Sequence, residues 1–173
     1  MKNIYLTGPR ACGKTTVGKM LAEYLKRPFV DTDQVFVEKH GQSIAECVDA
    51  EGWDVFRNRE AAVLRELAGR QGLVVACGGG IVLREENRKI LARGMTVYFD
   101  IDADELAQRL ENDPLEAQRP SLTGKSLAEE VRDVLKRRDP MYRESAHVVI
   151  TKDLPEFMVR TIARSAERLT EKT

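Results

Sequence analysis

The sequence predicts an α/β fold in which helices cover both faces of a parallel β-sheet. Short apolar runs alternate with helical patterns along the whole chain, as in folds built from βαβ units. No linker, repeat or low-complexity segment interrupts this alternation, and the composition, 42% hydrophobic and 32% charged, is ordinary for a globular protein. We therefore expect the 173 residues to form a single domain.

Five short apolar runs are predicted to be strands because they are rich in β-branched and aromatic residues. They lie at residues 3–6, 29–30, 73–76, 96–99 and 147–150. Ligands of parallel α/β sheets bind beyond the carboxyl ends of the strands. The residues that follow these runs are therefore the first candidates for function.

Seven segments carry apolar residues at three- and four-residue spacing, which predicts amphipathic helices. They lie at residues 14–26, about 43–50, 53–69, 85–92, 103–110, 126–138 and 155–169. The sixth helix is expected to end before Pro140, because proline cannot continue a helix and the basic run 136–138 supplies the cations favoured at a helix C-terminus.

Charge and targeting signals exclude several classes of function. The chain has 28 basic and 28 acidic residues, so its zero net charge gives no global attraction to nucleic acid or an anionic membrane. It has neither a signal-peptide pattern at the start nor an apolar run near 18 residues. We expect a cytoplasmic monomer with no nucleic-acid or membrane partner.

The cysteines and histidines do not form a recognisable framework. Cys12, Cys47 and Cys77 are widely spaced without a C-x-x-C pair, and the histidines are His40 and His147. This pattern predicts neither a disulfide scaffold nor a zinc site.

The strongest motif follows the first predicted strand. Residues 8–15 read G-x-x-x-x-G-K-T, from Gly8 through Gly13 to Lys14 and Thr15, and open a predicted helix. Inward-directed N–H groups and the helix N-terminus would hold a polyphosphate, Lys14 would reach its β- and γ-phosphates, and Thr15 would bind Mg²⁺. The alternative is a strand-to-helix turn with a capping threonine, which does not explain the lysine.

Two carboxylates leave the second strand, at Asp31 and Asp33. If the segment stays extended, alternation places both on one side, where one helps to hold Mg²⁺ and the other orients or deprotonates a hydroxyl group. Alternatively, an aspartate caps a helix that begins near Gln34.

Three consecutive glycines, Gly78, Gly79 and Gly80, follow the third strand. Such a run is costly in backbone entropy, so it indicates either a close approach of substrate to backbone N–H groups or positive φ angles. A dinucleotide-binding turn is a weaker alternative, since the full G-x-G-x-x-G pattern is absent.

The helix that starts near Trp53 combines aromatic and charged residues. Phe56 is expected to form a wall for an organic substrate, Arg57 to bind an acid group, and Glu60 to steady the arginine. The alternative is an ordinary amphipathic helix with a solvated ion pair.

A long polar connection at about 112–124 contains two prolines and a glycine. Connections of this length are often functional, and we expect a lid that closes Arg119 over a transferring phosphate and excludes water.

The order of these motifs resembles that of the shikimate kinases over essentially the whole chain. Each motif alone is moderately specific, but six in order with fitting spacings are highly specific. They are G-x-x-x-x-G-K-T-T ending at Thr16, D-T-D at 31–33, F-R at 56–57, G-G-G at 78–80, R-P at 119–120, and R-x-P-x-Y from Arg138 to Tyr142.

The resemblance implies a three-layer P-loop kinase fold, similar to the nucleoside monophosphate kinases, with a five-stranded parallel sheet. Substrate-binding helices would lie at about 33–62. It also implies transfer of the γ-phosphate of MgATP to the 3-hydroxyl of shikimate, which yields shikimate 3-phosphate and ADP in the chorismate pathway of aromatic amino-acid biosynthesis.

Matching motif positions carries the family's roles onto this chain. The implied shikimate-binding residues are Asp33, Arg57, Gly79, Gly80 and Arg138, to which the residues themselves add Phe56 and Gly78. The implied catalytic residues are Lys14, Asp33 and Arg119. The implied nucleotide site comprises Gly8, Gly13, Lys14, Thr15, Thr16, Arg109 and Arg119, with Thr15 and Asp31 at the metal.

The chain departs from the family pattern in three places. Ala11 stands where many relatives carry glycine, a change that should be tolerated if its φ is negative. Cys77 replaces the usual threonine or serine, and Thr151 and Lys152 follow the last strand where aspartate is common. Adenine contacts near 151–155 are therefore not carried over.

Two alternatives from other classes stay open at this point. Gluconate kinases share the loop and size, but their second-strand motif resembles D-G-D followed by histidine and proline, which this chain lacks. A nucleotide-dependent regulatory switch would use the loop as a sensor, but it does not require the glycine run or arginines around a cavity.

Overall fold

The computed structural model describes residues 1–112 and 126–171 of the chain. Its centre is a five-stranded sheet with the strand order β2-β3-β1-β4-β5, in which every neighbouring pair is parallel. The predicted parallel sheet is therefore confirmed. The strands are β1 (Ile4–Thr7), β2 (Phe29–Asp31), β3 (Val74–Ala76), β4 (Met95–Asp100) and β5 (Val148–Thr151).

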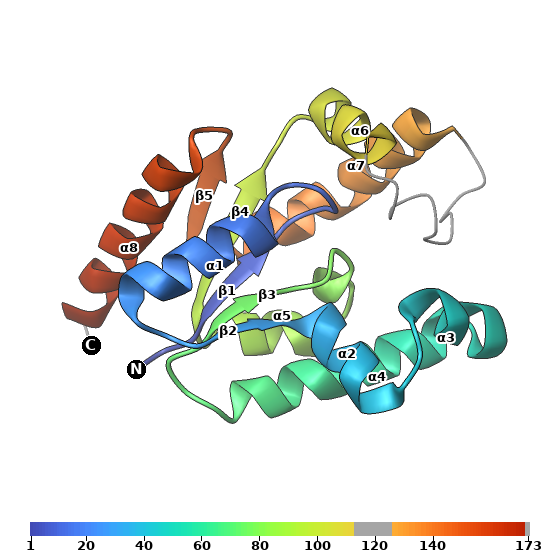
Figure 1. The fold of residues 1–173 in the computed structure, drawn as a ribbon, viewed down its shortest axis with the longest axis horizontal. Coiled ribbons are helices and arrows are strands. Elements are labelled where there is room, and N and C mark those ends of the chain that lie inside the picture. The colour runs from blue at the N-terminus through green and yellow to red at the C-terminus, as the bar shows by residue number, and fades with distance from the viewer. Residues whose placement is uncertain (113–125, 172–173) are drawn as a thin grey trace.

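Helices cover both faces of this sheet, so the protein has three layers (Figure 1). They are α1 (Lys14–Leu25), α2 (Thr32–His40), α3 (Ile44–Glu51), α4 (Trp53–Ala68), α5 (Glu85–Leu91), α6 (Ala103–Glu111), α7 (Leu127–Ser145) and α8 (Pro155–Glu171), with a short 3-10 turn at Ile81–Leu83. Helices α1 and α8 lie on one face, and α4 and α5 lie on the other. None of the helices in the described part of the chain is both long and apolar enough to cross a membrane.

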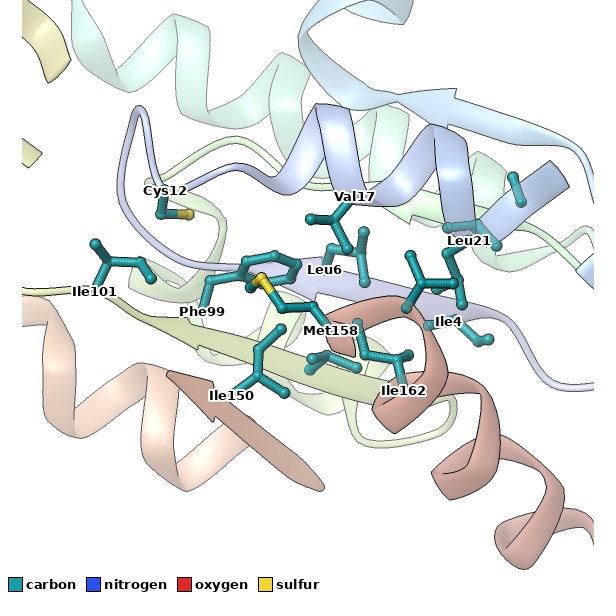
Figure 2. Close-up of a cluster of buried hydrophobic side chains, with 14 of the residues drawn as sticks. Ile4, Leu6, Cys12, Val17, Leu21, Phe99, Ile101, Ile150, Met158 and Ile162 are labelled. Carbon is teal, nitrogen blue, oxygen red and sulfur yellow. The ribbon is translucent and has the colours of Figure 1, made fainter. Parts of the chain in front are cut away.

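The two faces of the sheet belong to two separate cores. Ile4 and Leu6 of β1 pack with Val17 and Leu21 of α1 and with Ile162 of α8 (Figure 2). Tyr5, between them in sequence, points to the opposite face and packs with residues of α4 and α5. Successive strand side chains alternate between faces, so burial on both sides explains the continuously apolar strands.

A third, smaller core joins the helices beside the sheet. Phe36 of α2, Cys47 of α3 and Phe56 of α4 are buried together. The Phe36 and Phe56 rings pack edge to face, with their centroids 5.1 Å apart. Ser43 begins α3 with a capping box, since its hydroxyl accepts from the Glu46 N–H while the Glu46 carboxylate accepts from the Ser43 N–H. These contacts hold α2, α3 and α4 as one unit.

Helix α2 shows that the expected extended course of residues 31–33 is wrong. The strand ends at Asp31, whose carboxylate accepts from the Asp33 N–H at 3.0 Å and caps a helix that starts at Thr32. The capping alternative is therefore the correct one locally. Asp31 and Asp33 lie close through the first turn of a helix and not through strand alternation.

The predicted end of the sixth helix before Pro140 is also wrong, since α7 continues to Ser145. A proline inside a helix costs about 3 kcal/mol. Packing beyond it offsets this cost: the Tyr142 ring is fully buried and stacks on the Tyr98 ring with the ring centroids 4.9 Å apart, and Arg143 Nη2 lies 2.6 Å from Asp100 Oδ2. These contacts to β4 are non-local, so the local sequence signal did not reveal them.

Candidate active site

The loop between β1 and α1 adopts backbone conformations that need glycine at two positions. Gly8 and Gly13 have φ angles of 142° and 99°. A Cβ atom on Gly8 would also lie 2.9 Å from the Cys12 Sγ and 3.1 Å from the Phe99 carbonyl oxygen. The predicted strand–loop–helix context is therefore present, and the loop opens at the carboxyl end of β1 (Figure 1).

Ala11 in this loop does not meet the condition of a negative φ, because its φ is 60°. In that region the Cβ of an L-residue crowds the backbone, at a cost of about 1–2 kcal/mol. The loop therefore holds Ala11 in a left-handed conformation that a glycine would adopt more easily. The Ala11 carbonyl accepts a hydrogen bond from Arg109 Nη1 at 2.9 Å.

Lys14 spans the loop that precedes it. Its Nζ donates to the carbonyl oxygens of Gly8 at 2.9 Å and Pro9 at 2.7 Å, and it lies 3.4 Å from the Cys12 Sγ. The ammonium group therefore ties the two ends of the loop together. It also lines the larger of two adjoining pockets at this end of the sheet.

Thr15 and Asp31 come together as a candidate metal site. The Thr15 hydroxyl donates to Asp31 Oδ2 at 3.0 Å, while Asp31 Oδ1 accepts from the Asp33 N–H. No three His, Cys, Asp or Glu side chains gather within residues 1–112 and 126–171 as a cage for a cation. A hydroxyl and a carboxylate nevertheless suit Mg²⁺, which takes few protein ligands and keeps several waters.

Two pockets meet beside the loop. The larger, about 1310 Å³ including open solvent, is lined by residues 10–16, Asp31, Asp33 and Arg109. The smaller, about 530 Å³ on the same measure, is lined by Phe56, Arg57, Gly78, Gly79, Gly80 and Arg138, with Arg10, Asp33, Ile44, Trp53 and Glu60 completing its lining. The predicted phosphate-binding residues Gly13 to Thr16 line the larger pocket and most predicted substrate-binding residues line the smaller one, while Asp33, Gly78 and Gly79 line both.

The ion pair between Arg57 and Glu60 is buried. Arg57 Nη1 lies 2.7 Å from Glu60 Oε2, and the side chains are 13% and 4% exposed. The predicted pairing is confirmed, and the alternative of a solvated pair is wrong. Burial raises the pKa of the Glu60 carboxyl although Arg57 lies against it.

Aromatic rings hold the Arg57 guanidinium in place. Its central carbon lies 4.9 Å from the Phe56 ring centroid and 5.3 Å from the Trp53 ring centroid. Both contacts have the geometry of cation–π interactions. Arg57 is therefore pre-positioned by two rings and a carboxylate before any ligand binds.

The three glycines at 78–80 are not needed for unusual backbone angles, because none of their φ angles is positive. The reason for glycine here is the space that neighbouring side chains occupy. A Cβ atom on Gly80 would lie 2.2 Å from Arg57 Nη1, and one on Gly78 would lie 2.7 Å from Asp33 Oδ1. A Cβ atom on Gly79 would make only ordinary contacts, the nearest at 3.6 Å. Side chains pressed against Gly78 and Gly80 therefore explain two of the three glycines.

Arg138 reaches the same loop from α7. Its Nη1 donates to the Gly79 carbonyl at 3.1 Å, and the Tyr142 hydroxyl donates to the same oxygen. Burial lowers the pKa of Arg138, but an arginine stays charged at neutral pH. Two cationic side chains, Arg57 and Arg138, thus line one small pocket.

Arg109 lies at the far side of the larger pocket, where it pairs with Glu105. Lys152, one of the departures from the family pattern, also pairs with Glu105 at 2.9 Å.

Arg119 and nearly all of the predicted lid lie outside the described residues.

Two residues at the site were missed as functional candidates. Arg10 lines both pockets, but it occupies a position that the loop motif leaves unspecified. Tyr142 was noted as part of a motif without a role, and its contact with Gly79 joins residues far apart in sequence. The arginine between two loop glycines was the available signal for Arg10.

Known proteins are similar to this chain over most of its length. The family model described as shikimate kinase matches residues 10–167. Shikimate kinase 2 of Escherichia fergusonii is 49% identical over 148 residues, which is 85% of this chain and 81% of that protein. Shikimate kinase of Nitratidesulfovibrio vulgaris is 46% identical over 153 residues, covering 88% of this chain and 87% of that protein.

Solved structures agree with these matches. Shikimate kinase from Acinetobacter baumannii in complex with shikimate superimposes with a TM-score of 0.89 at 39% identity, covering 99% of this chain and 95% of that chain. A gluconokinase from Sinorhizobium meliloti reaches a TM-score of 0.59 at 20% identity, which reflects the fold alone. The predicted P-loop kinase fold is confirmed, and this chain belongs to the shikimate kinase family.

Proposed function

We propose that this protein transfers the γ-phosphate of MgATP to the 3-hydroxyl of shikimate and releases shikimate 3-phosphate and ADP. The observation that carries the proposal is the pairing of two pockets, one beside the phosphate-binding loop and one lined by Arg57 and Arg138. The family assignment supports the same reaction. We place it in the chorismate pathway and in the cytoplasm, and we expect residues 1–173 to act as a single-domain monomer.

Shikimate binding follows from the chemistry of the smaller pocket. Shikimate is a small ring with one carboxylate and several hydroxyls, so Arg57 and Arg138 would bind its carboxylate through charge-assisted hydrogen bonds. Phe56 supplies an apolar wall, and the backbone of Gly78 to Gly80 offers hydrogen-bonding groups at close range. The small volume of this pocket suits one such ring.

Asp33 is proposed to act on the acceptor hydroxyl because it lines both pockets. In the transfer, the shikimate oxygen forms a bond to the γ-phosphorus, the bond to the ADP oxygen breaks, and the hydroxyl proton passes to the Asp33 carboxylate. The first turn of α2 and the Asp31 cap hold Asp33 in position.

Lys14 and Arg119 are proposed to neutralise the transferring phosphate, while Gly8, Gly13 and Thr16 complete the phosphate-binding loop. Thr15 and Asp31 would hold Mg²⁺, which would supply charge neutralisation on the β- and γ-phosphates. Arg109 would lie beside the adenine. Phosphoryl transfer needs mainly positioning and charge stabilisation, and these residues provide both.

The experiment that tests the function measures ADP release with shikimate, gluconate, a panel of nucleoside monophosphates, and water as acceptors. We expect rapid release with shikimate and only background with the others. Rapid release with gluconate instead would contradict the proposal. Nucleotide hydrolysis that no acceptor stimulates would favour a nucleotide-dependent switch.

A further inference from the structure

Arg10 lies at the junction of the two pockets. Four residues of the described chain line both spaces, namely Arg10, Asp33, Gly78 and Gly79. The Arg10 backbone nitrogen lies 3.7 Å from where a Cβ atom on Gly79 would be, so the phosphate-binding loop and the glycine loop are neighbours here. Any group that passes from the larger pocket to the smaller one passes these four residues, and Arg10 is the cation among them.

An ion pair across the junction holds the Arg10 side chain. Its Nη2 lies 3.6 Å from Glu130 Oε1 of α7, and the two side chains are 25% and 4% exposed. Glu130 precedes Arg138 by eight residues, so both lie on the same side of α7. They line a small cavity together with Arg10. The guanidinium is thus placed between the phosphate-binding loop and the helix that carries Arg138.

The other cations of the smaller pocket are directed elsewhere. Arg57 lies against Glu60 and Gly80, and Arg138 donates to the Gly79 carbonyl. In the larger pocket, Lys14 donates to two carbonyls of its own loop. Arg10 alone among these four cations lines both the nucleotide side and the acceptor side.

We propose that Arg10 contacts the phosphoryl group as it crosses from ATP to shikimate, and then the phosphate of the product. This inference rests on the proposed function. The transferring group spreads negative charge over three oxygens, and a planar guanidinium can donate to two of them at once. Arg10 therefore acts on the transition state and on shikimate 3-phosphate, whereas Arg57 and Arg138 act on the carboxylate of both substrate and product.

The test compares the wild type with Arg10→Gln and Arg10→Lys. Arg84→Gln is the matched control, because Arg84 has a similar exposure of 31% and a similar ion pair, at 3.3 Å to Glu86, but lines neither pocket. Turnover is measured by ADP release, and the affinities for ATP, shikimate and shikimate 3-phosphate are measured by calorimetry. Thermal unfolding of each variant checks that it folds.

We expect Arg10→Gln to lower kcat by about ten- to a hundredfold and to weaken shikimate 3-phosphate binding by about tenfold or more. Shikimate affinity should stay within about threefold of wild type, because shikimate carries no phosphoryl group, and ATP affinity should fall less than that for shikimate 3-phosphate, because the γ-phosphate lies on the nucleotide side of the junction before transfer. Arg10→Lys should fall between, since lysine keeps the charge but loses the two-pronged geometry. Arg84→Gln should match the wild type.

If the wild type phosphorylates shikimate, three outcomes would overturn the inference about Arg10 and leave the proposed function standing. They are unchanged turnover in Arg10→Gln, equal weakening of shikimate and its 3-phosphate, and a joint loss of ATP and shikimate affinity. The second would mean that Arg10 binds the acid end, and the third that the loop is distorted. If Arg10→Gln does not fold, Arg10→Lys carries the same comparison. A wild type that does not phosphorylate shikimate would overturn the proposed function and this inference with it.

Discussion

The guanidinium of Arg57 occupies the space that a side chain on Gly80 would need. A Cβ atom on Gly80 would lie 2.2 Å from Arg57 Nη1 and 2.3 Å from its central carbon. Arg57 cannot move aside freely, because Glu60 and the Phe56 ring hold it. The glycine and the arginine are therefore one unit, in which the missing side chain of one allows the position of the other.

Gly80→Ala should displace Arg57 and raise the KM for shikimate by about tenfold or more, since overpacking of this kind costs about 1–3 kcal/mol. The KM for ATP should change little. Gly69→Ala is the control, because Gly69 follows α4 with a φ of −72° and lines neither pocket. Its effect on the shikimate KM should be several times smaller. A Gly80→Ala enzyme with wild-type shikimate kinetics would contradict this account.

Local signals in the sequence predicted most of the fold. Gly78, Gly79 and Gly80 were predicted to let a substrate approach the backbone, whereas the close neighbours in the structure are the Asp33 side chain at Gly78 and the Arg57 side chain at Gly80. The prediction that residues 31–33 stay extended was wrong, because the Asp33 N–H donates to the Asp31 carboxylate and a helix begins directly after the strand. Either course fits the same short stretch of residues.

Features that depend on contacts between residues far apart in the chain could not be predicted from the sequence. Helix α7 continues through Pro140 because Tyr142 stacks on Tyr98, 44 positions away by number. The role of Arg10 also depends on distant partners, since Glu130 and Gly79 meet it only in the folded protein. Of the candidate site, the residue types and strand-end positions could be predicted, whereas the separation into two pockets could not.

Lys14→Met should lower turnover by about three orders of magnitude, because it removes a charge from the transferring group. The variant should also be less stable by about 1–3 kcal/mol, since the carbonyls of Gly8 and Pro9 lose their charged donor. Steady-state kinetics and urea unfolding measure the two effects. Lys19→Met, which removes an exposed lysine from the same pocket, should cost less than about tenfold in turnover. Equal losses in the two variants would remove the special role of Lys14.

Ala11→Gly should stabilise the protein, although most glycine substitutions destabilise. Ala11 has a φ of 60°, and glycine removes the crowding of its Cβ, worth about 1–2 kcal/mol. The greater freedom of glycine in the unfolded chain offsets about 0.4–1 kcal/mol of this gain. Urea unfolding should therefore show a gain of up to about 1.5 kcal/mol. Ala92→Gly, at a position with a φ of −62°, should destabilise instead. A clear loss of stability in Ala11→Gly would show that the loop is not strained at this residue.

His147 should make the stability depend on pH. Its Nδ1 accepts from the Thr96 N–H at 3.1 Å, and burial lowers the pKa of the imidazole. The unfolded chain then binds a proton more readily than the folded one, so the contribution of His147 is present above the ordinary histidine pKa and is lost as the pH falls through the folded value. The free energy of unfolding of wild type relative to His147→Gln should therefore decrease from about pH 7.5 to about pH 5. An unchanged slope in His147→Gln would assign the effect to other groups.

Trp53, the single tryptophan of the chain, should report shikimate binding by its fluorescence. It lines the smaller pocket, and the Arg57 guanidinium lies 5.3 Å from its ring centroid. When Arg57 binds a carboxylate, the charge beside the indole is compensated, so the emission should change and saturate with shikimate. ATP alone should perturb the signal less, because Trp53 does not line the nucleotide pocket.

Arg57→Ala provides the decisive comparison for this signal. Loss of a charge-assisted pair should weaken shikimate binding by about 2–4 kcal/mol, so the titration should move to higher concentration. The spectrum of the free variant should also differ from wild type, since the cation beside the ring is gone. Arg59→Ala, two positions along α4 and paired with Glu51, should leave both the spectrum and the titration unchanged. A flat wild-type titration in a protein that turns over shikimate would show that Trp53 senses nothing at the pocket, and would remove the reason for placing the acid group at Arg57.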